Sequence, residues 1–329
     1  MHELVVRLNG VNAAFAPQGR GRHGPRASTS VSLFLFKDDR RLLHVLLDVG
    51  PDIPRVIEAD DLFPPAFPLD WVVFGHSHAD HCLGLDALCG DRHWWHKLRG
   101  EETPPIRVCC LPTTWSDVVD GHFPFQAKYL AHTAAAPGQP ATLWQDDEAR
   151  LQVTFLEVAH YRQSAASIFT FEKGNEAARV VCLFDFVDFH PAESGQAQAG
   201  GRADHPLFQQ PDLLIAEATL WGDPRVTVNR PVGHIHFEKL AQYIARWQPR
   251  ATRIVHYAGF EDMWSTGGPE QYRRLVAEGV RLHPRQGPVA RWELTVALQR
   301  HMRELGYARP ATMAAGEHLE TMLVFPTDG

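Results

Sequence analysis

A short segment with the sequence GHSHADHCLG, directly after the apolar run WVVF, constrains this chain more than any other. An apolar run of that length suits a buried strand better than a helix. Along an extended segment His76 and His78 point the same way, and the turn that follows can aim Asp80 and His81 at a neighbouring position about 3.5–4 Å away. Imidazole and carboxylate groups suit Zn²⁺ or a similar divalent ion. The segment therefore predicts a strand end that carries ligands for one or two metal ions.

The composition is typical of a globular chain and argues against two classes of partner. Of the 329 residues, 44% are hydrophobic and 22% are charged. The formal charge of −7 opposes binding of long nucleic acid, whose phosphates need a basic surface. The sequence holds no apolar run of the ~20 residues that a membrane helix needs, and its start, MHELVVRLNG, does not resemble a signal peptide. We therefore expect a cytoplasmic protein that binds neither membranes nor long nucleic acid.

Short apolar runs between turn signals predict strands, and helical periodicity appears later in the chain. The stretch after His236 places apolar residues on one face before Pro249 stops it. Two further helices are expected, one after Pro269 and one over 290–305 that Gly306 ends. The mixture predicts an α/β fold. The predicted strands are VSLFLF (31–36), LLHVLLDVG (42–50), DWVVFG (70–75), LQVTFLEV (151–158), RVVCLFDF (179–186), DLLIAEA (212–218) and TRIVHY (252–257).

The HxHxDH pattern resembles that of the metallo-β-lactamase superfamily. Members share a four-layer αββα sandwich with metals at one edge of the two sheets, so the resemblance implies one such domain over residues 1–329. It extends from LLDVGPD, where Asp48 is similar to the family's strand-end aspartate, to a closing strand TMLVF at 321–325. Residues past about 285 match least well and are expected to form a C-terminal extension.

The resemblance also implies three further ligands in a fixed order along the chain. His160 ends LQVTFLEVAH, Asp185 lies within VVCLFDF, and His256 follows TRIV. Two divalent ions would bind, with zinc as the expected ion and manganese or iron as alternatives. The implied first position consists of His76, His78 and His160 and the second of Asp80, His81 and His256, with Asp185 and a water or hydroxide bridging the two ions.

Residues between Asp185 and His256 resemble the phosphodiesterase branch of the superfamily, as in tRNase Z and the bacterial phosphoribosyl cyclic phosphate phosphodiesterase. DLLIAEATL contains Glu217 near its end, and NRPVGHIHFEKLAQYI brings His234 to the start of an amphipathic helix. The resemblance implies that the bridging hydroxide attacks a phosphodiester while His234 assists the leaving oxygen, oriented by Glu217 or Asp80. A structural role at the helix start is the competing interpretation of His234.

The substrate is expected to be a small or cyclic phosphodiester. Relatives that process tRNA carry a Lys-rich arm after the histidine of the second block, and Asp185 follows His160 too closely to leave room for it. Relatives of this branch often pair, so a homodimer is compatible with the sequence. A solvated surface is the competing interpretation of the arginine loop QGRGRHGPR. The weak candidates for phosphate contacts are Ser164, Ser167, Arg20, Arg22 and Arg26.

Two other functions stay open at this point. A thioester or lactone hydrolase of the glyoxalase II kind would use the same metals to polarise a carbonyl and would not need His234. A binding or regulatory protein on the same fold would use the metals for structure or ligand capture. The complete set of seven ligands argues against the second alternative, since loss of activity on a retained fold usually begins with loss of ligands.

Overall fold

The computed structural model describes eight segments of the chain. They are residues 1–11, 27–58, 69–160, 162–190, 202–218, 234–256, 298–313 and 321–325.

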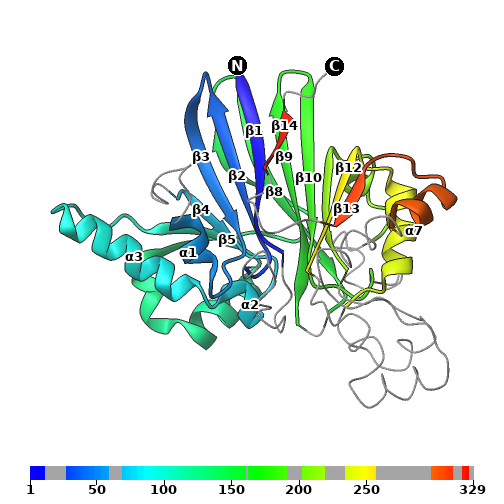
Figure 1. Cartoon of the computed structure of the whole chain (residues 1–329). Helices are drawn as coiled ribbons and strands as arrows, with labels where there is room; N and C mark the ends of the chain where they lie inside the picture. Colours follow the sequence, from blue (N-terminus) through cyan, green and yellow to red (C-terminus); the bar gives the residue numbers. More distant parts are fainter. Residues whose placement is uncertain are drawn as a thin grey trace, which may run out of the picture.

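Two seven-stranded mixed sheets face each other at the centre of the molecule (Figure 1). The first sheet has the order β14 (Thr321–Phe325), β1 (His2–Gly10), β2 (Ser30–Lys37), β3 (Arg40–Leu47), β4 (Trp71–Val73), β5 (Ile106–Cys110) and β6 (Leu130–Ala134). The second has the order β13 (Ala311–Met313), β12 (Ala251–Val255), β11 (Leu213–Glu217), β10 (Glu176–Leu183), β9 (Ser164–Lys173), β8 (Ala149–Val158) and β7 (Pro140–Gln145).

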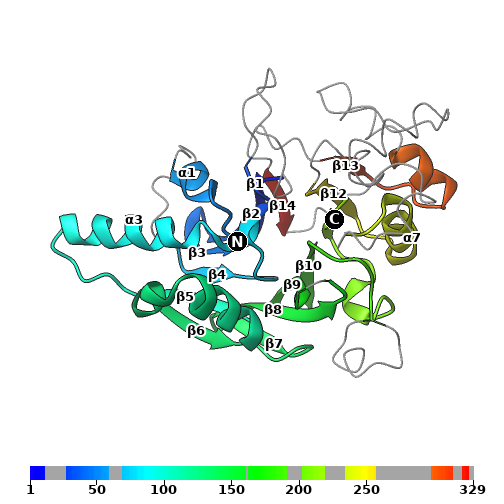
Figure 2. The same cartoon turned by 90° about the horizontal axis from the view of Figure 1, so that it is seen from below.

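Helices lie on both outer sides of the paired sheets (Figures 1 and 2). Beside the first sheet are α1 (Ile53–Glu58), α2 (Ala79–Cys82), α3 (Leu85–Leu98), α4 (Pro112–Trp115), a π-helical turn Ser116–Asp120 and a 3₁₀ turn Pro124–Tyr129. Beside the second are α7 (Phe237–Trp247) and a 3₁₀ turn Pro206–Phe208. One buried cluster fills the space between the sheets and under α7, and a second packs α1 and α3 against the first sheet. The predicted four-layer αββα sandwich is confirmed.

The strands predicted from the sequence all form, and so does the predicted closing strand β14. The helix after His236 also forms: Leu240, Ile244 and Trp247 are fully buried, and Gln248 ends it in a left-handed conformation before Pro249. Of the third predicted helix, 298–304 is helical and Gly306 follows with a φ of +84°. The helix expected after Pro269 and residues 290–297 lie outside the described residues. Within the described segments, no helix is long and apolar enough to span a membrane.

The directions of the strands bring the ends of six of them to one edge of the sandwich. β3 runs parallel to β4, and β10, β11 and β12 run parallel to one another. β8 and β10 both pair antiparallel with β9, so β8 runs in the direction of β10. This edge lies at the bottom of Figure 1, beside α2. Residues that follow these strands therefore meet there, although they come from two sheets and from distant parts of the chain.

Candidate metal centre

The GHSHADHCLG segment runs from the end of β4 into α2. His78 is the N-terminal flanking residue of that helix, in extended conformation, and His81 N donates to the His78 carbonyl at 3.0 Å. The turn that the sequence predicts is thus a single helical turn that carries Asp80 and His81. It places these two side chains beside each other, with Nε2 of His81 3.2 Å from Oδ2 of Asp80.

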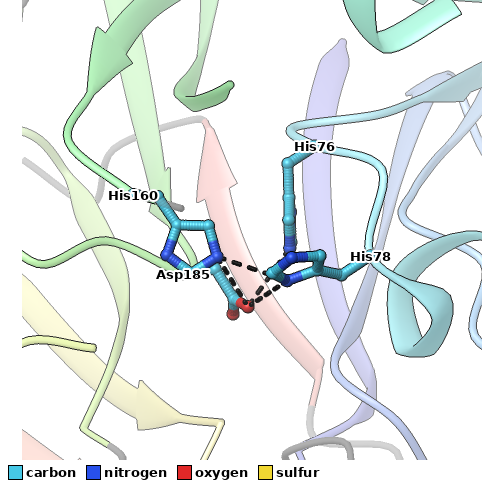
Figure 3. Close-up of side chains that lie close together, drawn as sticks. All are labelled: His76, His78, His160 and Asp185. Atoms are coloured by element: carbon cyan, nitrogen blue, oxygen red, sulfur yellow. Dashed lines mark hydrogen bonds and ion pairs between the residues drawn. The ribbon is translucent and has the colours of Figure 1, made fainter. Parts of the chain in front are cut away.

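Three histidines surround one oxygen of Asp185 (Figure 3). Oδ2 of this carboxylate lies 3.1 Å from Nε2 of His76, 3.6 Å from Nδ1 of His78 and 3.8 Å from Nε2 of His160. Nε2 of His160 is also 3.2 Å from Nδ1 of His78. Four ligand atoms thus converge from the ends of β4, β8 and β10, as the sequence predicts for the first metal position.

The other oxygen of Asp185 belongs to a second group. Oδ1 lies 3.0 Å from Nε2 of His256 and 3.4 Å from Nε2 of His81. Oδ2 of Asp80 is 3.3 Å from Nε2 of His256. Asp185 therefore presents one oxygen to each group, which is the arrangement expected of a bridging carboxylate. All seven residues predicted as ligands lie together at this edge.

The chemistry of this donor set suits divalent cations. Among the described residues, nothing hydrogen-bonds to the buried Nε2 of His76 or Oδ1 of Asp185, which is costly unless another group, such as a cation, contacts them. Burial lowers the pKa of His76, and it lowers the pKa of His160 to about 4, so both imidazoles are neutral at physiological pH and available as ligands. Although burial opposes ionisation of Asp185, the surrounding histidines hold its pKa well below the ordinary value. Neutral imidazoles and ionised carboxylates are the forms that bind metals.

Two buried carboxylates contact Nδ1 of the two histidines of the second group, on the ring side away from Asp185. Oδ2 of Asp48 is 2.7 Å from Nδ1 of His81, and Gly75 N donates to Oδ1 of Asp48 at 3.2 Å. Oε2 of Glu217 is 3.6 Å from Nδ1 of His256. A carboxylate on one ring nitrogen of a histidine fixes the tautomer and leaves the other nitrogen for a metal. Asp48 and Glu217 thus lie where they can orient His81 and His256.

His234 lies at the open side of the cluster. Its Nδ1 donates to Oε2 of Glu217 at 2.8 Å, its ring centre is 5.2 Å from that of His256, and 19% of its side chain is exposed. Of the two carboxylates proposed to orient it, Glu217 makes the bond, whereas Asp80 contacts His81 and His256. Burial lowers the pKa of His234, but Glu217 and Asp185 outweigh it and the net shift is upward. His236 caps α7 by accepting a hydrogen bond from Glu238 N.

Three strand-end residues of the cluster have a left-handed backbone. The φ angles are 59° at Asp48, 44° at Asp185 and 52° at His256. Left-handed non-glycine residues are uncommon, with Asp, Asn and His enriched among them, and they concentrate at functional sites. The chain turns sharply after β3, β10 and β12, and each turn directs its side chain into the cluster.

Close packing of backbones fixes α2 against the loop after β3. Val49 N donates to the His81 carbonyl at 2.6 Å, and Gly84 N donates to the Val49 carbonyl at 2.8 Å. A Cβ at Gly84 would lie 2.1 Å from the Gly50 carbonyl oxygen, so this approach requires glycine. The helical turn with Asp80 and His81 is thereby attached to the strand end with Asp48.

Of the residues predicted to contact substrate, the structure describes Ser164 and Ser167. Ser164 and Ser167 are both buried, and Ser164 donates to the Phe184 carbonyl at 3.5 Å. Within the described segments neither hydroxyl bonds to a member of the cluster, so their role in substrate binding stays a prediction. The three arginines of the QGRGRHGPR loop lie outside the described residues: Arg20, Arg22 and Arg26.

One cation beside the cluster was not singled out from the sequence. Nη1 of Arg162 lies 3.4 Å from the hydroxyl of Ser77 and 3.7 Å from Oδ2 of Asp117, and 47% of its side chain is exposed. Ser77 sits between His76 and His78. Its position two residues after the predicted ligand His160 is the sequence feature that could have identified Arg162 as a neighbour of the cluster.

The chain is similar to known proteins in its fold and in its family. Among curated proteins none matches the sequence. The metallo-β-lactamase fold protein YhfI from Bacillus subtilis is similar in structure, with a TM-score of 0.60 and 14% identity over 98% of this chain and 99% of that one. Unliganded yeast PDE1 gives 0.59 and 11% identity over 98% and 100%. A diphosphatase of the PhnP family gives 0.53 and 15% identity over 78% and 87%.

The family assignment rests on a match to the sequence itself. The model of the beta-lactamase superfamily domain matches residues 43–257, more than half of the chain. This range begins in β3 and ends directly after His256, so it contains all seven residues predicted as ligands. By sequence, fold and the composition of its candidate metal centre, the chain belongs to the beta-lactamase superfamily.

Proposed function

We propose that this protein is a binuclear metal-dependent hydrolase that cleaves a small or cyclic phosphodiester. The observation that carries the proposal is the placement of Asp185, with one oxygen toward His76, His78 and His160 and the other toward His81 and His256. A carboxylate shared in this way would hold two ions close together. The expected ion is Zn²⁺, and manganese and iron are the alternatives.

The ligand groups divide between two positions. His76, His78 and His160 would hold the first ion, and Asp80, His81 and His256 would hold the second. When bound, two divalent ions supply positive charge for the oxygens of a phosphoryl group and a nucleophile at neutral pH. Asp48 and Glu217 keep His81 and His256 in the orientation that this binding needs.

His234 is proposed as the proton donor to the leaving oxygen. Its Nδ1 is bonded to Glu217, so Nε2 is the nitrogen that can serve a substrate. Glu217 and Asp185 raise the pKa of His234 above its ordinary value, which increases the fraction of the imidazolium form. A leaving alkoxide gains negative charge in the transition state, and a positioned acid typically accelerates such a step by about 10²–10⁴-fold.

Two further observations support a phosphate ester over a thioester. One structural relative is a diphosphatase by name. A thioester hydrolase needs no acid at the position of His234, since a thiolate leaves without a proton, yet here a fully buried carboxylate is bonded to this histidine. Partners other than a small substrate are not required by this chemistry, and the homodimer stays a prediction.

The test combines metal analysis with a comparison of leaving groups. Purified protein with measured metal content would be assayed with bis(p-nitrophenyl) phosphate, with 2′,3′-cyclic AMP and with S-lactoylglutathione, a thioester. We expect hydrolysis of the phosphodiesters and little of the thioester. In His234→Ala the rate on the cyclic substrate, whose leaving group is an alkoxide, should fall by about 10²-fold or more. The rate on the p-nitrophenyl ester should fall much less, because p-nitrophenolate leaves without a proton.

The matched control is His236→Asn, which keeps a side-chain acceptor for the N-terminus of α7. It should retain both rates. Equal losses on both phosphodiesters in His234→Ala would contradict the role as proton donor, and preferential cleavage of the thioester would replace the proposed function by the glyoxalase II alternative.

A further inference from the structure

Beyond the ligands, Asp188 is held by two side chains of α7. The hydroxyl of Tyr243 donates to Oδ1 of Asp188 at 2.5 Å, and the ammonium of Lys239 donates to Oδ2. Lys239 and Tyr243 are one helical turn apart and therefore lie on the same face of α7. We call these three residues the Asp188 cluster. It is distinct from the metal ligands, and no step of the proposed mechanism uses it.

The backbone of Asp188 connects two loops that carry ligands. Ala159 N donates to the Asp188 carbonyl at 2.9 Å, and Val187 N donates to the Ala159 carbonyl at 2.7 Å. Ala159 immediately precedes His160, and Asp188 lies three residues after Asp185. The loop after β8 and the loop after β10 are thus bonded to each other as one unit, and the Asp188 carboxylate attaches that unit to α7.

Helix α7 is itself firmly fixed to the second sheet. The Tyr243 ring stacks on Trp247 with centroids 5.2 Å apart and an interplanar angle of 10°, and it packs edge-on against Phe189 at 5.1 Å. Trp247 is fully buried. The helix also begins shortly after His234, so one rigid element is connected to His160, Asp185 and His234.

We propose that the Asp188 cluster positions His160 and Asp185 for binding of the first metal ion, and this inference rests on the proposed binuclear site. Asp188 and Tyr243 are positioning residues, because they act through the loops and touch no substrate. A partly exposed Lys–Asp pair contributes little by itself, whereas a bond from a tyrosine hydroxyl to a carboxylate is charge-assisted and stronger. Burial and the Asp188 carboxylate raise the pKa of Tyr243 above its ordinary value, which keeps its hydroxyl protonated as a donor.

The test measures metal affinity in Tyr243→Phe. This variant removes one hydroxyl and keeps the ring that packs on Trp247 and Phe189. Zinc would be titrated into the metal-free protein in competition with a chromogenic chelator, and the affinity of each site would be fitted. We expect one of the two fitted affinities to fall by about 10-fold, the lower end of the range for groups that orient ligands. Asp188→Asn should give a loss in the same direction.

The matched control is Tyr307→Phe. Tyr307 is fully buried in the second half of the sandwich, where Tyr243 is half-buried, and its hydroxyl bonds to the Pro249 carbonyl at 3.1 Å and lies 3.2 Å from that of Thr252. Thr252 is near the start of β12, away from the ligand edge. Tyr307→Phe should therefore lower the unfolding temperature about as much as Tyr243→Phe does, while leaving both zinc affinities unchanged.

The outcomes separate this inference from the proposed function. Zinc affinities in Tyr243→Phe and Asp188→Asn equal to those of the wild type and of Tyr307→Phe would overturn the inference. A wild-type protein that binds two zinc ions but cleaves no phosphodiester would overturn the proposed function alone, because the readout here is affinity. A loss of zinc affinity in Tyr243→Phe and Asp188→Asn, with unchanged affinity in Tyr307→Phe, would support the positioning role of the Asp188 cluster.

Discussion

Replacing Gly84 by alanine tests whether close backbone packing holds the ligand-bearing turn in place. Gly84 has a φ of −75°, which any residue adopts, so its backbone conformation adds no cost. The cost comes from contact, since the new Cβ would lie 2.1 Å from the Gly50 carbonyl oxygen. To relieve that contact, α2 must move away from the loop after β3, which breaks the bonds from Val49 to His81 and from Gly84 to Val49.

The expected magnitude follows from these contacts. Overpacking costs about 1–3 kcal/mol, and each of the two lost hydrogen bonds costs about 1 kcal/mol. We expect Gly84→Ala to lower the free energy of unfolding by roughly 3–5 kcal/mol, a fall on the order of 10 °C in the unfolding temperature. Zinc affinity should fall with it, because Asp80 and His81 belong to the displaced turn.

The control is Gly90→Ala in the interior of α3, where an added Cβ meets none of the described residues within 4 Å. It should raise stability by about 0.5–1 kcal/mol through helix propensity. Calorimetric unfolding of the metal-free proteins and zinc titration provide the readouts. A Gly84→Ala protein as stable as Gly90→Ala, with unchanged zinc affinity, would refute this reasoning.

Three other predictions follow from the same structure. Asp48→Asn should weaken zinc binding by about 10–100-fold, because the neutral amide no longer polarises His81. Competition with a chelator measures this affinity. An unchanged affinity would exclude the orienting role of Asp48. Chelation of bound metal should lower the unfolding temperature, since an ion at 100 times its Kd adds about 2.7 kcal/mol to stability. The same unfolding temperature with and without metal would argue against the proposed metal site. Burial, with Arg41 and Arg7, holds the pKa of His44 well below 6.5, so the unfolded chain binds a proton there that the folded chain does not. Stability of the metal-free protein should thus be lost as the pH falls below about 6.5, by up to about 1.4 kcal/mol per pH unit, and urea unfolding should show a smaller loss in His44→Gln.

The sequence predicts much of the fold because the strands are short apolar runs bounded by turn signals. Other strands were not predicted, among them β1, β5 and one that begins with small residues. β9, with the sequence SAASIFTFEK, was not predicted, yet its first six residues are buried because it lies between β8 and β10 in the middle of the second sheet. α3 was also missed. Trp94 is 56% exposed on that helix, so its apolar residues do not mark a single buried face.

The convergence of the seven predicted ligand residues could be predicted because each lies at the end of a strand or in the turn after it, in an order that resembles that of the superfamily. The residues around them could not. Asp188 bonds to side chains 51 and 55 positions later in the chain, and no local pattern connects such distant residues. Glu217 and Asp80 were equal candidates to orient His234 until the fold brought Glu217 within 2.8 Å of it.

At three positions of the ligand edge, an alanine substitution would affect the backbone as well as remove the side chain. At Asp48, Asp185 and His256 the chain has a positive φ, and alanine there adds a conformational cost of about 1–2 kcal/mol to whatever its missing side chain causes. Asparagine tolerates that backbone region and keeps a polar side chain. Mutagenesis libraries on this scaffold should therefore offer asparagine, and not alanine, wherever a strand turns into the cluster.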